Sequence, residues 1–139
     1  MLIRLALEHN LEGHRILCWG LDFPGVFTYG EDDAEALLRF PQALIKYETW
    51  VNLHTDTPWF HLDDLDFRVL EVFEDYQTKI ENQDYEVNAF FQNDLRPLSQ
   101  EDIERCLLVF KWQRQELLSG IETLPTDLLK KPPGTNLGP

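Results

Sequence analysis

The chain contains 139 residues, of which 43% are hydrophobic and 12% aromatic, so it is large and apolar enough to form one folded domain with a core. Its 12 basic and 25 acidic side chains give a net charge of −13, which repels phosphate backbones and argues against direct nucleic-acid binding. This charge suits a basic protein partner, or serves solubility alone.

Three short strands joined by tight turns are predicted over residues 2–29. Alternating apolar residues predict half-buried strands over 2–8 and 14–21, and a β-branched and aromatic run predicts a third over 26–29. Proline fixes its own φ and glycine accepts positive φ, so a tight turn precedes the third strand and a glycine ends it. Together the strands predict an antiparallel meander. Its turn residues are Pro24, Gly25 and Gly30.

A long helix is predicted over residues 33–54. Asp32 is a suitable N-cap, and Glu35, three residues later, completes an arrangement of the capping-box type. Apolar residues recur at three- and four-residue spacing and form one stripe along the segment. Because Pro41 removes one hydrogen bond inside the helix, we expect a kink near Phe40, with two successive helices over 34–40 and 42–52 as the alternative.

The middle of the chain predicts a second pair of strands. Residues 55–65 form a loop rich in aspartate, and apolar alternation predicts strands over 67–74 and 85–91. The polar residues 75–84 between them are expected to form a long loop. We therefore expect these two strands to pair as a hairpin.

A second long helix is predicted over residues 100–123, after a linker at 93–98. Ser99 is a suitable N-cap, and Asp102 stands at the N3 position of the same capping box. An apolar stripe again runs along the helix. The proline- and glycine-rich residues 131–139 are expected to be disordered.

The predicted fold class is α+β: an antiparallel sheet of β-β-β-α-β order with one kinked helix on a face, an extra strand and a long C-terminal helix. The domain organisation that follows is an α+β domain over 1–92, a helical appendage over 93–130 and a disordered tail over 131–139. We expect the stripe of the C-terminal helix, or an edge strand, to pair with another copy in a homodimer.

Cysteine usage and the absence of a membrane segment indicate a cytoplasmic location. Cys18 and Cys106 lie far apart in apolar patterns without a Cys-x-x-Cys spacing, so each is expected to be a small buried residue. No apolar run is long enough to cross a membrane, and the first residues lack the layout of a signal peptide.

The residues selected as candidate partner contacts lie in the loop at 55–65. The aromatic pair Trp59 and Phe60 is a candidate contact surface for a protein partner, together with the acidic residues Asp63 and Asp64. The aromatics Trp19 and Phe27, in contrast, are expected to belong to the core.

No catalytic, cofactor or metal site is predicted. His54 and His61, with nearby aspartates, lack the tight spacing typical of metal ligands. The acidic residues around Asp32 are better explained by helix capping than by general acid–base chemistry. The chain also has no G-x-S-x-G sequence and no glycine-rich phosphate loop. A small-molecule sensor, in which the sheet and the Trp59 loop enclose a ligand, remains an alternative.

The first half of the chain resembles the HicB-like antitoxin family. Residues 22–30 are Asp-Phe-Pro-Gly-Val-Phe-Thr-Tyr-Gly, and residues 34–37 are Ala-Glu-Ala-Leu. The similarity covers about residues 2–75 and implies the β-β-β-α-β order. HicB-like antitoxins bind a small basic ribonuclease toxin, and many carry a C-terminal DNA-binding segment. This chain has no ribbon-helix-helix or helix-turn-helix pattern after the domain, so the resemblance implies toxin binding without DNA binding.

The C-terminal helix more weakly resembles the first helix of a DinB-like four-helix bundle. The residues concerned are 98–103, Leu-Ser-Gln-Glu-Asp-Ile, 111–118, Lys-Trp-Gln-Arg-Gln-Glu-Leu-Leu, and 124–129, Leu-Pro-Thr-Asp-Leu-Leu. That family performs metal-dependent thiol transfer with three histidines on later helices, and none of the four histidines here matches them. The resemblance implies the N-terminal part of a longer protein.

The sequence therefore predicts a non-catalytic HicB-like module that binds a protein or serves as the accessory part of a DinB-like protein. One alternative is an antitoxin-like inhibitor of a small basic ribonuclease toxin. Another alternative is a fragment of a metal-dependent thiol transferase. We expect no cofactor, no membrane partner and no direct nucleic-acid partner.

Overall fold

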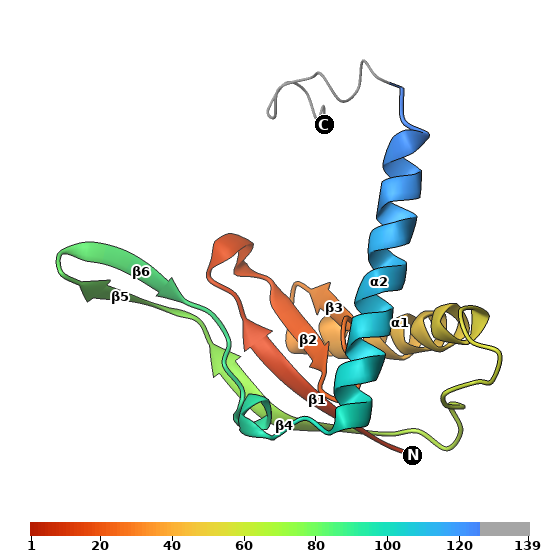
Figure 1. Cartoon of the computed structure of the whole chain (residues 1–139). Coiled ribbons are helices and arrows are strands. Elements are labelled where there is room, and N and C mark those ends of the chain that lie inside the picture. Colours follow the sequence, from red (N-terminus) through yellow and green to blue (C-terminus); the bar gives the residue numbers. More distant parts are fainter. Residues whose placement is uncertain (126–139) are drawn as a thin grey trace. The chain divides into compact units, whose positions relative to one another are not determined.

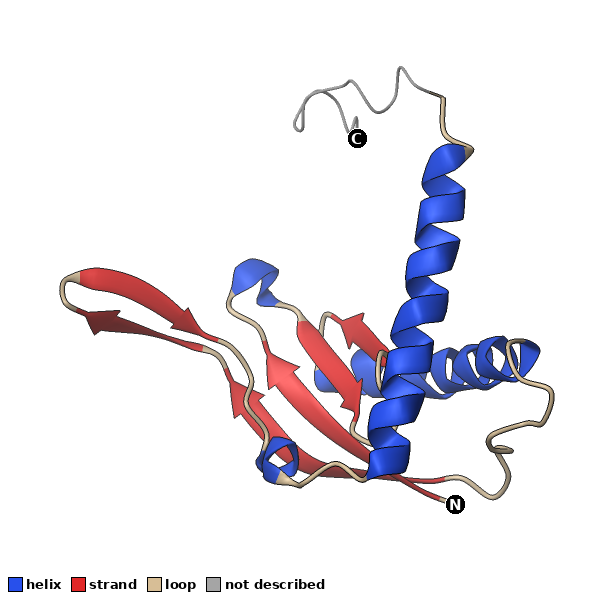
Figure 2. Cartoon of the chain, viewed as in Figure 1, coloured by secondary structure: helices blue, strands red, loops and turns tan. Residues whose placement is uncertain are grey.

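The computed structural model describes residues 1–125 and divides the chain into two units, Met1–Leu98 and a second unit that begins at Ser99. The α+β class is confirmed, because the described residues form six strands and two α-helices (Figures 1 and 2). The tail predicted at 131–139 lies outside the described residues.

A four-stranded sheet forms the centre of the first unit. β1 (Leu2–His9), β2 (Ile16–Gly20) and β3 (Phe27–Gly30) pair as the predicted antiparallel meander. β4 (Asp66–Glu74) pairs with the other side of β1, but in parallel, so the sheet is mixed and has the order β3-β2-β1-β4. A parallel neighbour requires a long crossover, which the helix between β3 and β4 supplies.

α1 (Asp33–Leu53) packs on one face of this sheet. The helix passes through Pro41 without ending, so one helix rather than two follows the meander. Phe40 and Leu44 are fully buried against the apolar face of β1. Burial raises the pKa of the Cys18 thiol to about 12, so this cysteine is a core residue rather than a nucleophile. The core residues are Ile3, Leu5, Leu7, Cys18, Val26, Ala36, Phe40 and Leu44.

The predicted pairing of strands 67–74 and 85–91 is wrong. β4 pairs with β1, and a separate hairpin joins β5 (Tyr76–Ile80) to β6 (Gln83–Val87) (Figure 1). β5 lies inside the segment that was predicted to be a loop. The sequence does not indicate this strand, because nearly all of its residues are exposed and its apolar residues do not alternate. A two-residue turn closes this hairpin, since Glu81 and Asn82 both have positive φ, as such turns require.

Phe27 does not belong to the core, contrary to the prediction. Its side chain is 45% exposed, and Trp19 is half-buried. The two rings, whose centroids are 5.2 Å apart, come from paired positions of β2 and β3. Trp19 also pairs with Ala6, which alternates with the core residues of β1, so both rings lie on the face opposite α1.

The second unit contains α2 (Gln100–Glu122), which lies where the sequence predicts a helix. Ser99 Oγ accepts a hydrogen bond from the Asp102 amide at 3.1 Å, and the Ser99 amide donates to Asp102 Oδ2 at 3.0 Å. These two bonds form a capping box and satisfy two amides at the helix start.

Candidate functional site

The face of the sheet opposite α1 is covered by a segment that we call the strap, residues 88–95, which includes the short 3-10 helix η2 (Gln92–Leu95). Its backbone is tied to acidic side chains of the sheet. The Ala89 amide donates to Glu8 Oε1 at 3.3 Å, and the amides of Gln92 and Asn93 donate to the Glu71 carboxylate at 2.6 and 3.0 Å. These bonds hold an otherwise irregular segment against β1 and β4.

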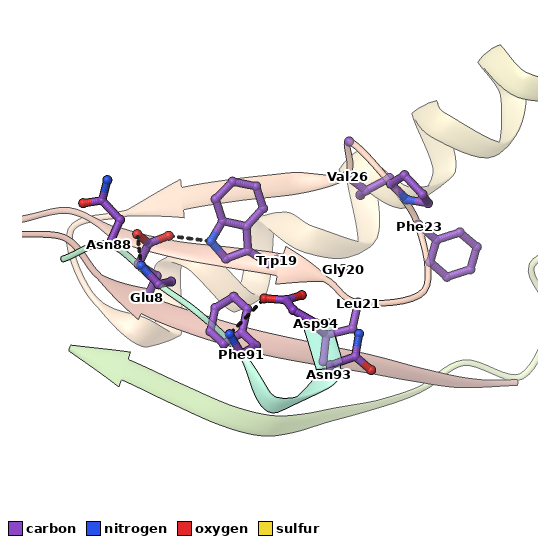
Figure 3. Close-up of a pocket in the computed structure, with 13 residues that line it drawn as sticks. Glu8, Trp19, Gly20, Leu21, Phe23, Val26, Asn88, Phe91, Asn93 and Asp94 are labelled. Carbon is purple, nitrogen blue, oxygen red and sulfur yellow. Dashed lines mark hydrogen bonds between the residues drawn. The ribbon is translucent and has the colours of Figure 1, made fainter. Parts of the chain in front are cut away.

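A cleft of about 450 Å³ opens between the strap, the end of β2 and the turn that precedes β3 (Figure 3). Aromatic rings and carboxylates from separate elements meet in it, and none of its lining residues is basic. A concave site with an apolar wall and a few polar groups is the usual form of a binding site. The side chains that give it this character are Glu8, Trp19, Phe23, Phe91 and Asp94.

Glu8 is a buried carboxylate at the floor of this cleft. It is only 5% exposed, and β1 directs it to the face opposite the core. Trp19 Nε1 donates to its Oε2 at 2.7 Å, while the Ala89 amide donates to its Oε1 (Figure 3). Each oxygen therefore has one donor, which offsets part of the cost of burying the charge and fixes the orientation of the side chain.

Asp75 lies next to Glu8 at the junction of β4 and β5 and is also 5% exposed. Neither of its carboxylate oxygens has a hydrogen-bond donor within the part of the chain that the structure describes. Burial, repulsion from Glu8 and the charge of Glu86 raise the pKa of Asp75 to about 6. We call Glu8 and Asp75 the acidic pair; neither forms an ion pair with a described residue.

The four predicted contact residues are not in this cleft. Phe60 is half-buried, with its ring centroid 5.1 Å from that of Phe23, so it packs on the outside of the turn that borders the cleft. Trp59 is half-buried in the same loop, and its amide donates to Asn52 at 3.2 Å. The other two, Asp63 and Asp64, are exposed in the loop before β4.

The residues predicted for caps and turns shape the cleft and the start of α1. Asp32 Oδ1 accepts from the Glu35 amide at 2.8 Å, which caps the helix. Pro24 and Gly25 line the cleft, and Gly25 has a φ of 85°, a conformation that disfavours other residues. A side chain at Gly30 would approach the Ala36 amide to 2.5 Å, so only glycine fits where β3 meets α1.

The two histidines weighed as metal ligands, His54 and His61, contact different partners. His54 Nδ1 is 2.8 Å from the Trp50 carbonyl, and His61 Nδ1 is 3.5 Å from a carboxylate oxygen of Glu48. Within residues 1–125, no three His, Cys, Asp or Glu side chains are grouped as metal ligands would be.

The chain matches no protein-family model, no curated protein and no solved structure. The described helices include none with the length and apolar character needed to cross a membrane. The functional argument therefore depends on the geometry of the cleft.

Sequence reasoning missed the acidic pair and the strap. Glu8 occupies a position of β1 that is exposed to solvent in a half-buried strand. The neighbouring sequence gives no sign that residues 88–95 cover this side chain. The one available signal was Trp19, an aromatic residue at a paired position on the same face.

Proposed function

We propose that this chain is a non-catalytic protein-binding module whose cleft receives a basic segment of a partner protein. The observation that carries this proposal is the buried carboxylate of Glu8, with Asp75 next to it, at the floor of a cleft that has aromatic walls and no basic residue in its lining. Buried carboxylates without a counter-charge are unfavourable, so a cation from outside the chain gains more here than on an ordinary surface.

The chemistry of the cleft favours arginine or lysine side chains. A carboxylate offers about four lone-pair sites, and Trp19 and Ala89 use one on each oxygen of Glu8, so acceptor capacity remains. Asp94, exposed on the strap, supplies a second carboxylate, and the ring of Trp19 can interact with a guanidinium group. The chain's net charge of −13 would also accelerate encounter with a basic protein.

This function agrees with the expectation from the HicB-like resemblance, in which the partner is a small basic ribonuclease toxin. The strand and helix order β-β-β-α-β supports the proposal. An antitoxin-like inhibitor is the narrower form of the same proposal.

Binding of labelled peptides, followed by fluorescence anisotropy, tests the proposal. An arginine-rich peptide should bind, and a neutral peptide of the same length should not. The Asp94→Asn variant should weaken binding about tenfold, because it removes one charge from the cleft while the amide oxygen can still accept from Phe91.

The matched control is Asp63→Asn, which removes the same charge from an exposed position outside the cleft. It should change the affinity less than about twofold, as expected for a screened surface charge. An equal loss in both variants would mean that only net charge attracts the peptide, and the proposed cleft would be rejected. Absence of binding at low salt would reject it as well.

A further inference from the structure

We infer that the acidic pair, Glu8 and Asp75, holds one proton between its two carboxyl groups, and that a cation entering the cleft displaces this proton. The inference rests on the proposed function, because it states how the same cleft exchanges a proton for a basic side chain. The affinity for the partner is then lower in mildly acidic surroundings than in neutral ones.

The strand register brings the two carboxyl groups together. Glu8 pairs with Phe73, and side chains two residues apart along a strand share a face, so Asp75 lies on the same face as Glu8. The Asp75 amide donates to the His9 carbonyl at 3.1 Å, which fixes the junction of β4 and β5 beside the end of β1. The carboxyl group of Asp75 therefore lies within hydrogen-bonding reach of Glu8.

The hydrogen bonds of the acidic pair leave a place for one proton. Each oxygen of Glu8 accepts one bond, from Trp19 Nε1 and from the Ala89 amide. Neither oxygen of Asp75 has a donor among the described residues, although the side chain is almost fully buried. Two buried carboxylates in contact repel each other, whereas a proton on Asp75 removes this repulsion and allows its hydroxyl group to donate to Glu8. A single proton therefore supplies the missing hydrogen bond and lowers the buried charge.

The charges around Asp75 favour the protonated form. Glu86 of β6 also faces this carboxyl group, and β2 and the strap supply hydrogen-bond donors to the acidic pair but no positive charge. His9 and Glu74 alternate with the acidic pair and lie on the other face, where His9 Nε2 is 2.9 Å from Asp33 Oδ1 and His9 Nδ1 is 3.8 Å from Glu74 Oε1. Burial and the negative charges of Glu8 and Glu86 raise the pKa of Asp75 to about 6, so the proton is held below this pH and released above it.

A cation in the cleft acts on this proton through Glu8. Glu8 lines the cleft, whereas Asp75 does not. A guanidinium or ammonium group that pairs with Glu8 stabilises the ionised form of both carboxyl groups, so the pKa of Asp75 falls towards its ordinary value. The proton passes to the solvent, and the cation replaces it as the counter-charge. Below about pH 6 the cation has to displace the proton, which weakens binding; above this pH the proton is already absent.

The arginine-rich peptide tests this exchange, because arginine stays charged throughout the pH range. Its affinity for the unmodified chain should rise about tenfold from about pH 5 to about pH 7, as expected if binding lowers the pKa of Asp75 from about 6 to near 3.8. Asp75→Asn cannot lose a proton, while its amide can still donate to Glu8, so its affinity should change less than about twofold over this range. Asp63→Asn, the exposed control, should keep the tenfold change.

Calorimetry in two buffers with different heats of ionisation counts the proton that leaves. At about pH 5, the unmodified chain should release about 0.8 proton for each peptide bound, and Asp75→Asn should release less than about 0.2. Equal affinity at both pH values, with binding intact, would overturn the exchange and leave the proposed function in place.

Absence of binding at either pH would reject the proposed function and the exchange with it. Infrared spectra of the chain without peptide test the shared proton separately. At about pH 5, the unmodified chain should show the signal of a protonated carboxyl group that is lost on raising the pH to about 7, and Asp75→Asn should lack this signal. A spectrum of the unmodified chain without it would overturn the shared proton, whatever the peptide does.

Discussion

The two long helices begin with the same kind of cap, but the apolar residues along them differ in exposure. α1 and α2 each have a side-chain cap and an amphipathic stripe. In α1, Phe40 and Leu44 are fully buried, whereas in α2, Phe110 and Leu117 are 65% and 63% exposed. Local sequence therefore determines where each helix forms, but not what its apolar stripe contacts. The stripe of α1 completes the core of the first unit.

The largest effect is expected when one aromatic ring is removed from each helix in turn. Phe40→Ala should lower the free energy of unfolding of the first unit by about 3–5 kcal/mol, because it leaves a cavity in a closed core. Phe110→Ala should change that free energy by less than about 0.5 kcal/mol, because the ring is already in solvent. Urea unfolding followed by tryptophan fluorescence measures both, at concentrations low enough to avoid association. Equal losses would show that the two helices share one core.

A second test concerns the stability of the first unit and uses its acidic pair, Glu8 and Asp75. The pKa of Asp75 is raised from 3.8 to about 6, so the folded state holds a proton that the unfolded chain releases, and stability falls as the pH rises through this window. Asp75→Asn should remove this dependence and should stabilise the chain at neutral pH by about 1–3 kcal/mol.

Thermal unfolding of the unmodified chain and of Asp75→Asn across this pH range measures the effect. Asp63→Asn is the control, since it removes an exposed acidic group and should leave the dependence in place. A pH dependence that is identical in the unmodified chain and in Asp75→Asn would show that the acidic pair does not bind this proton.

The smallest expected effect concerns the caps. Asp32→Ala should destabilise the first unit by about 1 kcal/mol, because α1 loses the acceptor for the Glu35 amide. Ser99→Ala removes the matching acceptor from α2, and it should reduce the helical signal in circular dichroism while the unfolding of the first unit stays constant. A lower melting temperature of the first unit in Ser99→Ala would show that the cap of α2 also stabilises the first unit.

Elements with a strong local pattern could be predicted from sequence, and long-range arrangements could not. The alternation in residues 2–8 and the stripe of residues 100–123 specify a strand and a helix by themselves. The parallel pairing of β4 with β1 and the polar strand β5 have no such pattern. The cleft could not be predicted either. Glu8 becomes a buried carboxylate only because Asp75 and the strap, which are distant in sequence, lie beside it.

The parallel pairing of β1 with β4 has a consequence for the order in which the protein can form during synthesis. Leu2 pairs with Asp66, so β1 cannot gain its second neighbour until β4, the last strand of this sheet in the sequence, has been made. At a rate of about 5–20 residues per second, that strand waits for roughly 3–13 seconds with one edge open. Each nascent chain therefore passes through an interval in which its central strand can pair with the wrong neighbour, and slower translation lengthens it.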